Sequence, residues 1–239
     1  MNILAIDTSN QVLGIAILSK EQIIGEMITN LKQNQTSRLM PAIHQLMKDI
    51  DMEPNQLDKI VVAKGPGSYT GVRIGVTTAK SLAWGLAIPV VGVSSLEVLA
   101  YQGRFYDSLI CPFFDARRGR IYTGIYQWEN HKMNLVLEET NISMVDWLKQ
   151  IKEYDQEIMF FSPNIRLFKE TIMKHLDKLA IFPEETLHIA KPSNLAIAGM
   201  NREGEHLHSF VPNYLRLAEA EANWINSKKE TKSYGETRN

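Results

Sequence analysis

Two short segments carry residue types that bind phosphate and other anions. The loop Gly65–Gly71, with the sequence GPGSYTG, lies between a hydrophobic strand and a helix rich in small residues. Such a loop presents backbone N–H groups to an anion, but it also makes a plain tight turn. The segment Asp7-Thr8-Ser9 follows the first predicted strand and places a carboxylate beside two hydroxyl groups. An anion site and a simple turn are both open at each segment.

Neither segment matches a standard catalytic motif. Lys80 and Ser81 follow Gly75 by five positions or more, but the second glycine of a phosphate-binding loop is missing and the pair lies inside a helix. The chain contains no Gly-x-Ser-x-Gly pattern, so it has no nucleophile elbow. Efficient ATP hydrolysis is therefore not expected.

The helix after the glycine loop carries a small residue at every fourth position: Gly71, Gly75, Ala79 and Ala83. Glycine inside a helix costs about 1 kcal/mol relative to alanine, so two in one row indicate that another element approaches closely. That element is either a partner's helix or this chain's own sheet, and the spacing leaves both open. If a partner fills the row, a large charged residue at Gly75 should break the complex and leave the chain folded.

The sequence predicts neither a metal site nor a disulfide. The six histidines form no H-x-x-x-H or H-E-x-x-H pair, and His206 and His208 lie in a polar segment without a third ligand. Cys111 is the only cysteine, and we expect it to be a buried apolar residue.

The charges are balanced, because 26 lysine and arginine residues accompany 27 acidic residues. No global positive field therefore attracts nucleic acid. The one basic cluster is Arg117, Arg118 and Arg120, which is either a solvated hairpin tip or a contact to RNA phosphate or an acidic partner. The single cysteine and the lack of an apolar run of roughly 20 residues predict a soluble, cytoplasmic protein without a membrane span.

Hydrophobic periodicity predicts the same order of elements twice. The first half reads as strands 2–6, 12–18, 22–29, 58–63 and 89–93, and helices 37–50, 70–86 and 94–101, the last opened by a capping box of Ser94 and Glu97. The second half reads as strands 109–115, 120–128, 132–137, 157–161 and 179–182, and helices 143–151, 165–175 and 193–202. This order predicts an α/β protein with a duplicated ribonuclease-H-like (actin-like ATPase) fold, in two lobes with mixed sheets flanked by helices.

We expect an N-terminal lobe over residues 1–104, a C-terminal lobe over 105–211 and a segment over 212–239 that is disordered after about residue 225. In actin-like proteins, the first hairpin and nearby loops surround a nucleotide. A vestigial nucleotide site would here consist of Asp7, Thr8, Ser9, Gly65, Gly67 and Ser68.

Five stretches resemble the TsaB (YeaZ) family, in order and at family-like spacing, over residues 1 to about 221. They are ILAIDTS, GPGSYTGVRIG, AKSLAWGLAIPVVGVSSLEVLA, DARRGRIYTGIY and PNYLRLAEAE. The resemblance implies an actin-like protein of the bacterial machinery that makes threonylcarbamoyladenosine (t6A) beside the tRNA anticodon. One departure is Phe161-Ser162-Pro163-Asn164, where relatives often have a glycine-containing turn. This departure weakens the case for ATP between the lobes.

The resemblance also implies a non-catalytic subunit that pairs with the catalytic subunit TsaD through helices of the N-terminal lobe and works with the ATPase TsaE. It implies no required cofactor (weak binding of ATP or ADP is allowed), no metal, indirect contact with tRNA and a homodimer in isolation. TsaD holds a metal with histidines on a helix, and this sequence lacks that pair. The expected partner interface is Leu39, Met40, Ile43, Leu46, Met47, Gly71, Val72, Gly75, Ala79 and Ala83.

The alternative is a stand-alone actin-like ATPase or metallopeptidase built on Asp7 and the glycine loop. Such an enzyme would turn over ATP or a peptide by itself with a divalent metal. We do not expect this, because the sequence offers no set of metal ligands and no placed general base.

Overall fold

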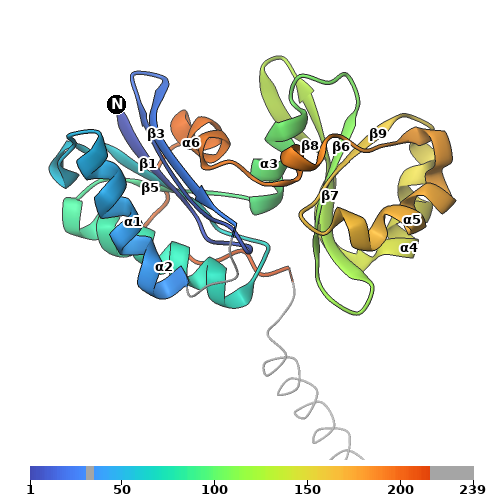
Figure 1. Cartoon of the computed structure of the whole chain (residues 1–239), viewed down its shortest axis with the longest axis horizontal. Helices are drawn as coiled ribbons and strands as arrows, with labels where there is room; N and C mark the ends of the chain where they lie inside the picture. The colour runs from blue at the N-terminus through green and yellow to red at the C-terminus, as the bar shows by residue number, and fades with distance from the viewer. Residues whose placement is uncertain (31–34, 216–239) are drawn as a thin grey trace, which may run out of the picture.

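The computed structural model describes residues 1–30 and 35–215 as two lobes lying side by side (Figure 1). The first repeat consists of β1 (Asn2–Asp7), β2 (Leu13–Ser19), β3 (Gln22–Thr29), α1 (Gln35–Asp49), β4 (Lys59–Ala63), α2 (Tyr69–Leu86), β5 (Val90–Val93) and α3 (Ser95–Ala100). The second consists of β6 (Leu109–Asp115), β7 (Arg120–Glu129), β8 (Lys132–Ser143), α4 (Met144–Ile151), β9 (Ile158–Phe161), α5 (Ile165–Leu176), β10 (Ala180–Ile181) and α6 (Pro192–Met200). Short 3-10 helices lie at Pro54–Gln56, Tyr101–Gly103, Lys152–Tyr154, Asp177–Leu179 and Glu185–His188.

The two repeats have the same sheet topology. The strand order is β3-β2-β1-β4-β5 in the first sheet and β8-β7-β6-β9-β10 in the second. In each sheet the first three strands form an antiparallel meander, and the other two strands run parallel to the first strand of the repeat. This arrangement confirms the predicted duplicated ribonuclease-H-like fold.

Helices lie on both faces of each sheet, and the third helix of each repeat crosses to the other lobe (Figure 1). The outer faces are covered by α1 and α2 in the first lobe and by α4 and α5 in the second. Between the sheets, α6 packs on β1 and β2, whereas α3 packs on β6 and β7. One buried cluster therefore joins the lobes, and it includes Ile3, Val98, Ile110 and Leu195. The predicted lobe boundaries stay a prediction.

The helix that follows the glycine loop has defined ends. Ser68 is its N-cap, and the Ser68 side chain accepts a hydrogen bond from Gly71 N. The helix ends where Ala87 adopts the left-handed conformation (φ 54°), two residues before Pro89. These signals place α2 within one residue of its predicted bounds.

Most predicted bounds agree with the structure to within one or two residues, and two elements differ in other ways. The strand predicted over 132–137 extends to Ser143, because residues 140–143 pair with the start of β7 beyond an irregularity next to Gly124. At α3, Ser94 accepts hydrogen bonds from Leu96 N and Glu97 N as a cap should, but the Glu97 carboxylate bonds to Arg202 instead of closing a capping box.

Residues Glu205–Tyr214, called here the C-terminal strap, run back across the first lobe. Glu205 N donates to Val90 O (2.8 Å), and Asn213 N donates to Lys64 O (2.7 Å). Phe210 is buried in the core beneath α2. The strap thus ends beside the glycine loop, while the disorder expected after about residue 225 falls outside the described residues.

Candidate functional site

The glycine loop and the first turn of α2 lie directly on the β1–β2 turn. Ser68 N donates to Ser9 O at 2.7 Å. A Cβ atom on Gly67 would lie 2.1 Å from Ser9 O, and one on Gly71 would lie 2.1 Å from Thr8 O. Real side chains do not approach that closely, so only glycine permits this packing. The small-residue row therefore faces this chain's own hairpin.

The polar groups of the β1–β2 turn bond to one another and to α2. Ser9 N and Ser9 Oγ both donate to Asp7 Oδ1, at 2.9 and 2.7 Å, and Thr8 Oγ1 donates to Gly71 O at 2.7 Å. All three side chains are buried, and burial raises the pKa of the Asp7 carboxyl group. This is the Asx-turn arrangement that the sequence left open beside an anion site.

The six residues predicted for a nucleotide site do lie together, but they do not fit a phosphate group. The carbonyl oxygens of Thr8 and Ser9 fill the space above Gly71 and Gly67. On the other side, Asn213 O of the strap would lie 2.7 Å from a Cβ on Gly65. An anion entering this space would meet carbonyl oxygens, which repel it, in place of the N–H donors of a phosphate loop.

The corresponding turn of the second lobe is also tied to its own surroundings. Ser162 Oγ accepts from Asn164 N (3.0 Å), and Ser162 N donates to the buried His188 Nδ1 (3.2 Å). Asn164 Oδ1 in turn accepts from Asp115 N (3.3 Å). This segment, Phe161–Asn164, therefore closes a turn at the end of β9.

The structure buries most of the side chains predicted for an interface on α1 and α2, and the interface itself stays a prediction. Of the ten predicted side chains, Met40 is 46% exposed, whereas the others are buried: Leu39, Ile43, Leu46, Met47, Gly71, Val72, Gly75, Ala79 and Ala83. They pack on the outer face of the first sheet, because the apolar stripe of an amphipathic helix is the face that the core buries. They support the two helices from beneath, and among these nine only Ile43 and Met47 also line the groove on the outer side of α1 and α2. A large residue at Gly75 would also disturb the fold, since its Cβ would lie 2.6 Å from Thr8 Oγ1.

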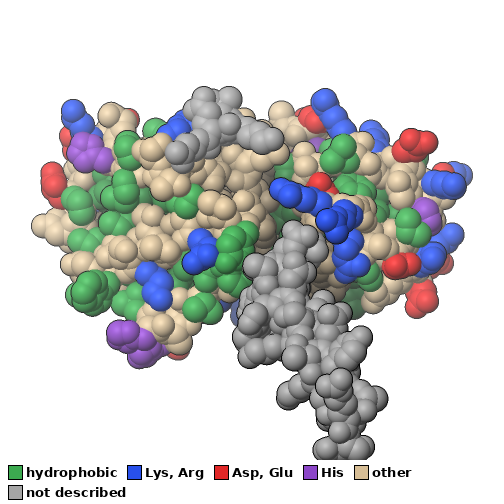
Figure 2. Space-filling view, turned by 90° about the horizontal axis from the view of Figure 1, so that it is seen from below, with side chains coloured by type: hydrophobic (Ala, Val, Ile, Leu, Met, Phe, Trp, Pro, Cys, Tyr) green, Lys and Arg blue, Asp and Glu red, His purple; other side chains and the backbone are tan. Residues whose placement is uncertain are grey.

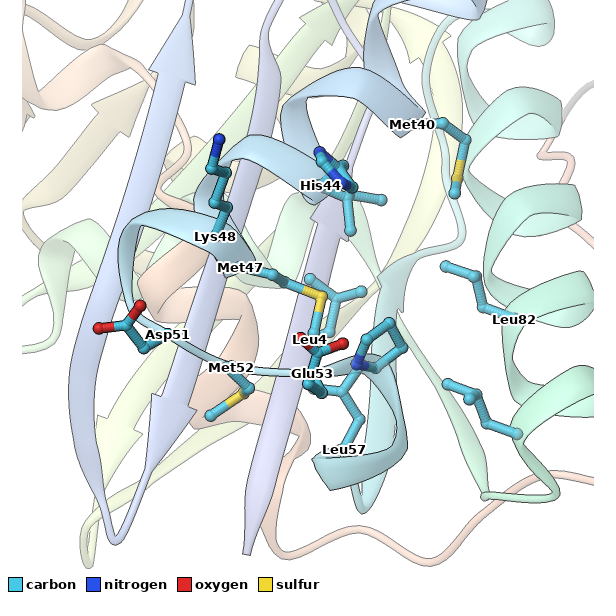
Figure 3. Close-up of a pocket in the computed structure, with 13 residues that line it drawn as sticks. Leu4, Met40, His44, Met47, Lys48, Asp51, Met52, Glu53, Leu57 and Leu82 are labelled. Carbon is cyan, nitrogen blue, oxygen red and sulfur yellow. The ribbon is translucent and has the colours of Figure 1, made fainter.

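A groove on the outer side of α1 and α2 remains open. It encloses a cavity of about 280 Å³, and Figure 3 shows its methionine and leucine side chains together with His44 and Lys48 at its edge. The lining residues are Leu4, Met40, Ile43, His44, Met47, Lys48, Asp51, Met52, Glu53, Pro54, Leu57, Leu82 and Leu86. A mostly apolar groove of this size accepts one or two apolar side chains of a partner.

A polar cluster between the lobes was not predicted. Glu139 of β8 accepts hydrogen bonds from the hydroxyl groups of Ser94 and Tyr126, and Asn213 Nδ2 donates to its second oxygen at 3.4 Å. Burial raises the pKa of Glu139 and that of Tyr126. Because these residues are far apart in sequence, only their distances in the fold reveal the cluster. It joins β8, the start of α3 and the strap.

No group of three histidine, cysteine, aspartate or glutamate side chains that could hold a metal ion occurs among residues 1–30 and 35–215. Cys111 is buried, with its pKa raised by burial to about 11. Within the same ranges, no helix is both long and apolar enough to cross a membrane.

Two lobes of repeated ribonuclease-H-like topology define an actin-like protein. In agreement, YeaZ from Pseudomonas aeruginosa superposes with a TM-score of 0.75, covering 90% of this chain and 99% of that protein at 23% identity. The ROK hexokinase from Thermus thermophilus superposes with a TM-score of 0.51, covering 84% and 97% at 7% identity.

Sequence similarity is more specific. The tRNA threonylcarbamoyladenosine biosynthesis protein TsaB of Bacillus subtilis is 52% identical over 229 residues, which cover 96% of this chain and all of that protein. TsaB of Escherichia coli is 29% identical over 58% of this chain and 63% of that protein. A family model described as TsaD, tRNA N6-adenosine threonylcarbamoyltransferase, matches residues 22–224. The chain belongs to the TsaB family.

Replacing Gly71 with alanine should destabilise the protein by about 1–3 kcal/mol or more, because the new methyl group overlaps Thr8 O. Gly85→Ala is the matched control on the same helix. No atom lies within 4 Å of a Cβ at that position, so this change should stabilise α2 by up to about 1 kcal/mol. Urea unfolding of both variants measures the difference, and equal effects would contradict the packing described for the loop.

Replacing Asp7 with asparagine should raise stability near pH 7. A carboxyl group whose pKa is raised by burial stabilises the fold while protonated, and this contribution is lost as the pH rises through the folded-state pKa. Asparagine keeps the acceptor oxygen for Ser9 without the charge, so its advantage should shrink as the pH falls towards about 4.

Asp146→Asn is the control for this experiment. The Asp146 carboxylate is exposed and its pKa is lowered, chiefly by the Ser143 hydroxyl group, so its removal should have the opposite sign at neutral pH. Urea midpoints measured from pH 4 to 8 report both effects. A wild-type protein more stable than Asp7→Asn at pH 7 would refute the assignment.

Proposed function

We propose that this chain is a scaffold or activator subunit of the bacterial t6A transferase that pairs with the catalytic subunit TsaD and works with the ATPase TsaE. The observation that carries the proposal is the 52% identity to Bacillus subtilis TsaB along 96% of the chain. The match to the TsaD family model supports pairing between relatives that share one fold. Since the substrate is tRNA, the working compartment is the cytoplasm.

The chain's own contribution is binding, not chemistry. Asp7 is the carboxylate on which a stand-alone ATPase would depend, and it is buried and engaged by Ser9. A general base must reach its substrate, which this carboxyl group cannot do from its present position. The subunit therefore works without a required nucleotide, and any binding of ATP or ADP is weak.

The partner contacts the open groove and the exposed residues around it. Met40 on α1 is 46% exposed and lines the groove, so an incoming side chain can reach it. Two helices of TsaD laid across α1 and α2 would fill the groove and form a four-helix packing unit. In the absence of TsaD, a second copy of the chain would use the same groove.

Met40→Glu should weaken the complex with TsaD at least about tenfold, because a carboxylate at the groove must be desolvated when the partner binds. The isolated variant should stay folded, since Met40 is already half exposed. Co-purification of the two chains, followed by titration calorimetry, measures the change.

Leu167→Glu is the matched control, because Leu167 is 69% exposed on α5, at the other end of the molecule. It should leave the complex unchanged. Equal affinity of Met40→Glu and wild type would rule out the groove as the contact. Absence of any complex between the wild-type chain and TsaD would refute the proposed function.

A further inference from the structure

The turn between β6 and β7 presents three arginines on a hydrogen-bonded platform. Arg117 N donates to Asp115 Oδ1 (2.8 Å), and Arg120 N donates to Arg117 O (3.1 Å). Ala116 N donates to Arg120 O (2.9 Å), which closes the turn. Arg117, Arg118 and Arg120 are all exposed. We call Arg117–Arg120 the arginine tip.

Two of these arginines occupy backbone positions that favour other residues. Arg117 has φ 67° and Arg118 has φ 55°, and Gly119 follows with φ 70°. In this left-handed region a Cβ atom lies close to the following carbonyl oxygen, a cost that glycine escapes and that asparagine and aspartate offset by local hydrogen bonds. Because the side chains are exposed, core packing does not account for arginine here. An exposed guanidinium group at this turn can reach a ligand from solvent.

Two cations share one carboxylate at the base of the tip. Arg120 is oriented by Asn141, whose Oδ1 accepts from Arg120 Nε at 2.6 Å. The pKa of Asp146 is lowered first by the Ser143 hydroxyl group and then by Lys149 as well as Arg120. Lys149 Nζ lies 3.5 Å from this carboxylate, so Asp146 interacts with both cations.

Exposed aromatic rings lie at the start of α2. Tyr69 and Tyr214 stack with their ring centres 5.3 Å apart, and both are almost half exposed. The Arg73 guanidinium lies 5.1 Å from the centre of the Tyr69 ring and donates to its hydroxyl group. Seen from below, Figure 2 shows lysine and arginine side chains gathered on the second lobe beside the boundary between the lobes.

We propose that the arginine tip binds backbone phosphates of RNA. This inference rests on the proposed function, since it gives the tRNA a direct contact with this subunit. Guanidinium groups bind phosphate oxygens in a bidentate manner, and exposed rings beside a cation provide stacking planes for unpaired bases. An acidic peptide would use the arginines but not the rings, so the combination favours RNA. Because the charges of the whole chain are balanced, any attraction to RNA has to come from a local patch such as this one.

The test measures binding of an unmodified tRNA transcript to the full chain, alone and with TsaD, at several salt concentrations. The double variant Arg117→Ala and Arg118→Ala should bind roughly tenfold more weakly. The slope of log affinity against log salt should fall by about 1 for each phosphate that the variant no longer neutralises. Arg117→Lys with Arg118→Lys should recover part of the affinity, because charge returns without the bidentate geometry.

Arg166→Ala with Lys169→Ala is the control, since it removes two cations from α5 of the same lobe. It should leave affinity and slope unchanged. Equal effects of both double variants, or none from the tip variant, would overturn the proposal. So would intact tRNA binding combined with loss of binding to TsaE, which would assign the tip to an acidic protein.

The two proposals fail in different ways. The first case is that the wild-type chain forms no complex with TsaD, while the tip variant binds tRNA more weakly than wild type. The proposed function is then wrong and the RNA contact of the arginine tip is supported. The second case is that the complex forms and the tip variant binds tRNA with the affinity of wild type. Only the inference about the arginine tip is then wrong.

Discussion

The close approach of α2 to the β1–β2 turn is the contact on which the rest of the structure depends. The backbone carbonyl groups of Thr8 and Ser9 occupy the positions that side chains on Gly71 and Gly67 would need. This contact fixes α2 on the first sheet and brings it beside α1, so that the outer groove can form between them. The same carbonyl groups lie against Gly71 and Gly67 in the predicted vestigial nucleotide site. One packing contact therefore shapes both this loop and the groove beside α2.

Much of the fold could be predicted from the residues, because strand and helix periods and cap signals are local. The duplicated order of elements and the bounds of α2 belong to this class. The spacing of Gly71 and Gly75 also predicts a close approach, but not the element that approaches. The predicted interface includes the apolar stripe of α1. In the structure the stripe residues Leu39, Ile43 and Leu46 are buried in the core of this chain. Hydrophobic periodicity identifies the buried face of a helix and cannot say whether its own chain or another covers it.

Contacts between residues far apart in the sequence could not be predicted, because they depend on how the elements pack. The residues of α3 and α6 do not indicate which sheet each helix covers. That each helix packs on the sheet of the other lobe is seen only in the folded structure. The Glu139 cluster likewise joins residues that lie 13 to 74 positions apart. Together, these features hold the lobes in one arrangement and set the groove on one side and the arginine tip on another. That separation suits a subunit that links a catalytic partner to RNA.

The central claim is that this chain contributes binding surfaces and no reacting group. Reconstituted t6A formation on a tRNA transcript, with TsaD, TsaE and threonylcarbamoyl-adenylate supplied, tests it most directly. We expect little product without this chain, full activity with Asp7→Asn and strongly reduced activity with Met40→Glu. Loss of activity in Asp7→Asn, with the complex with TsaD intact and the protein folded, would contradict the claim.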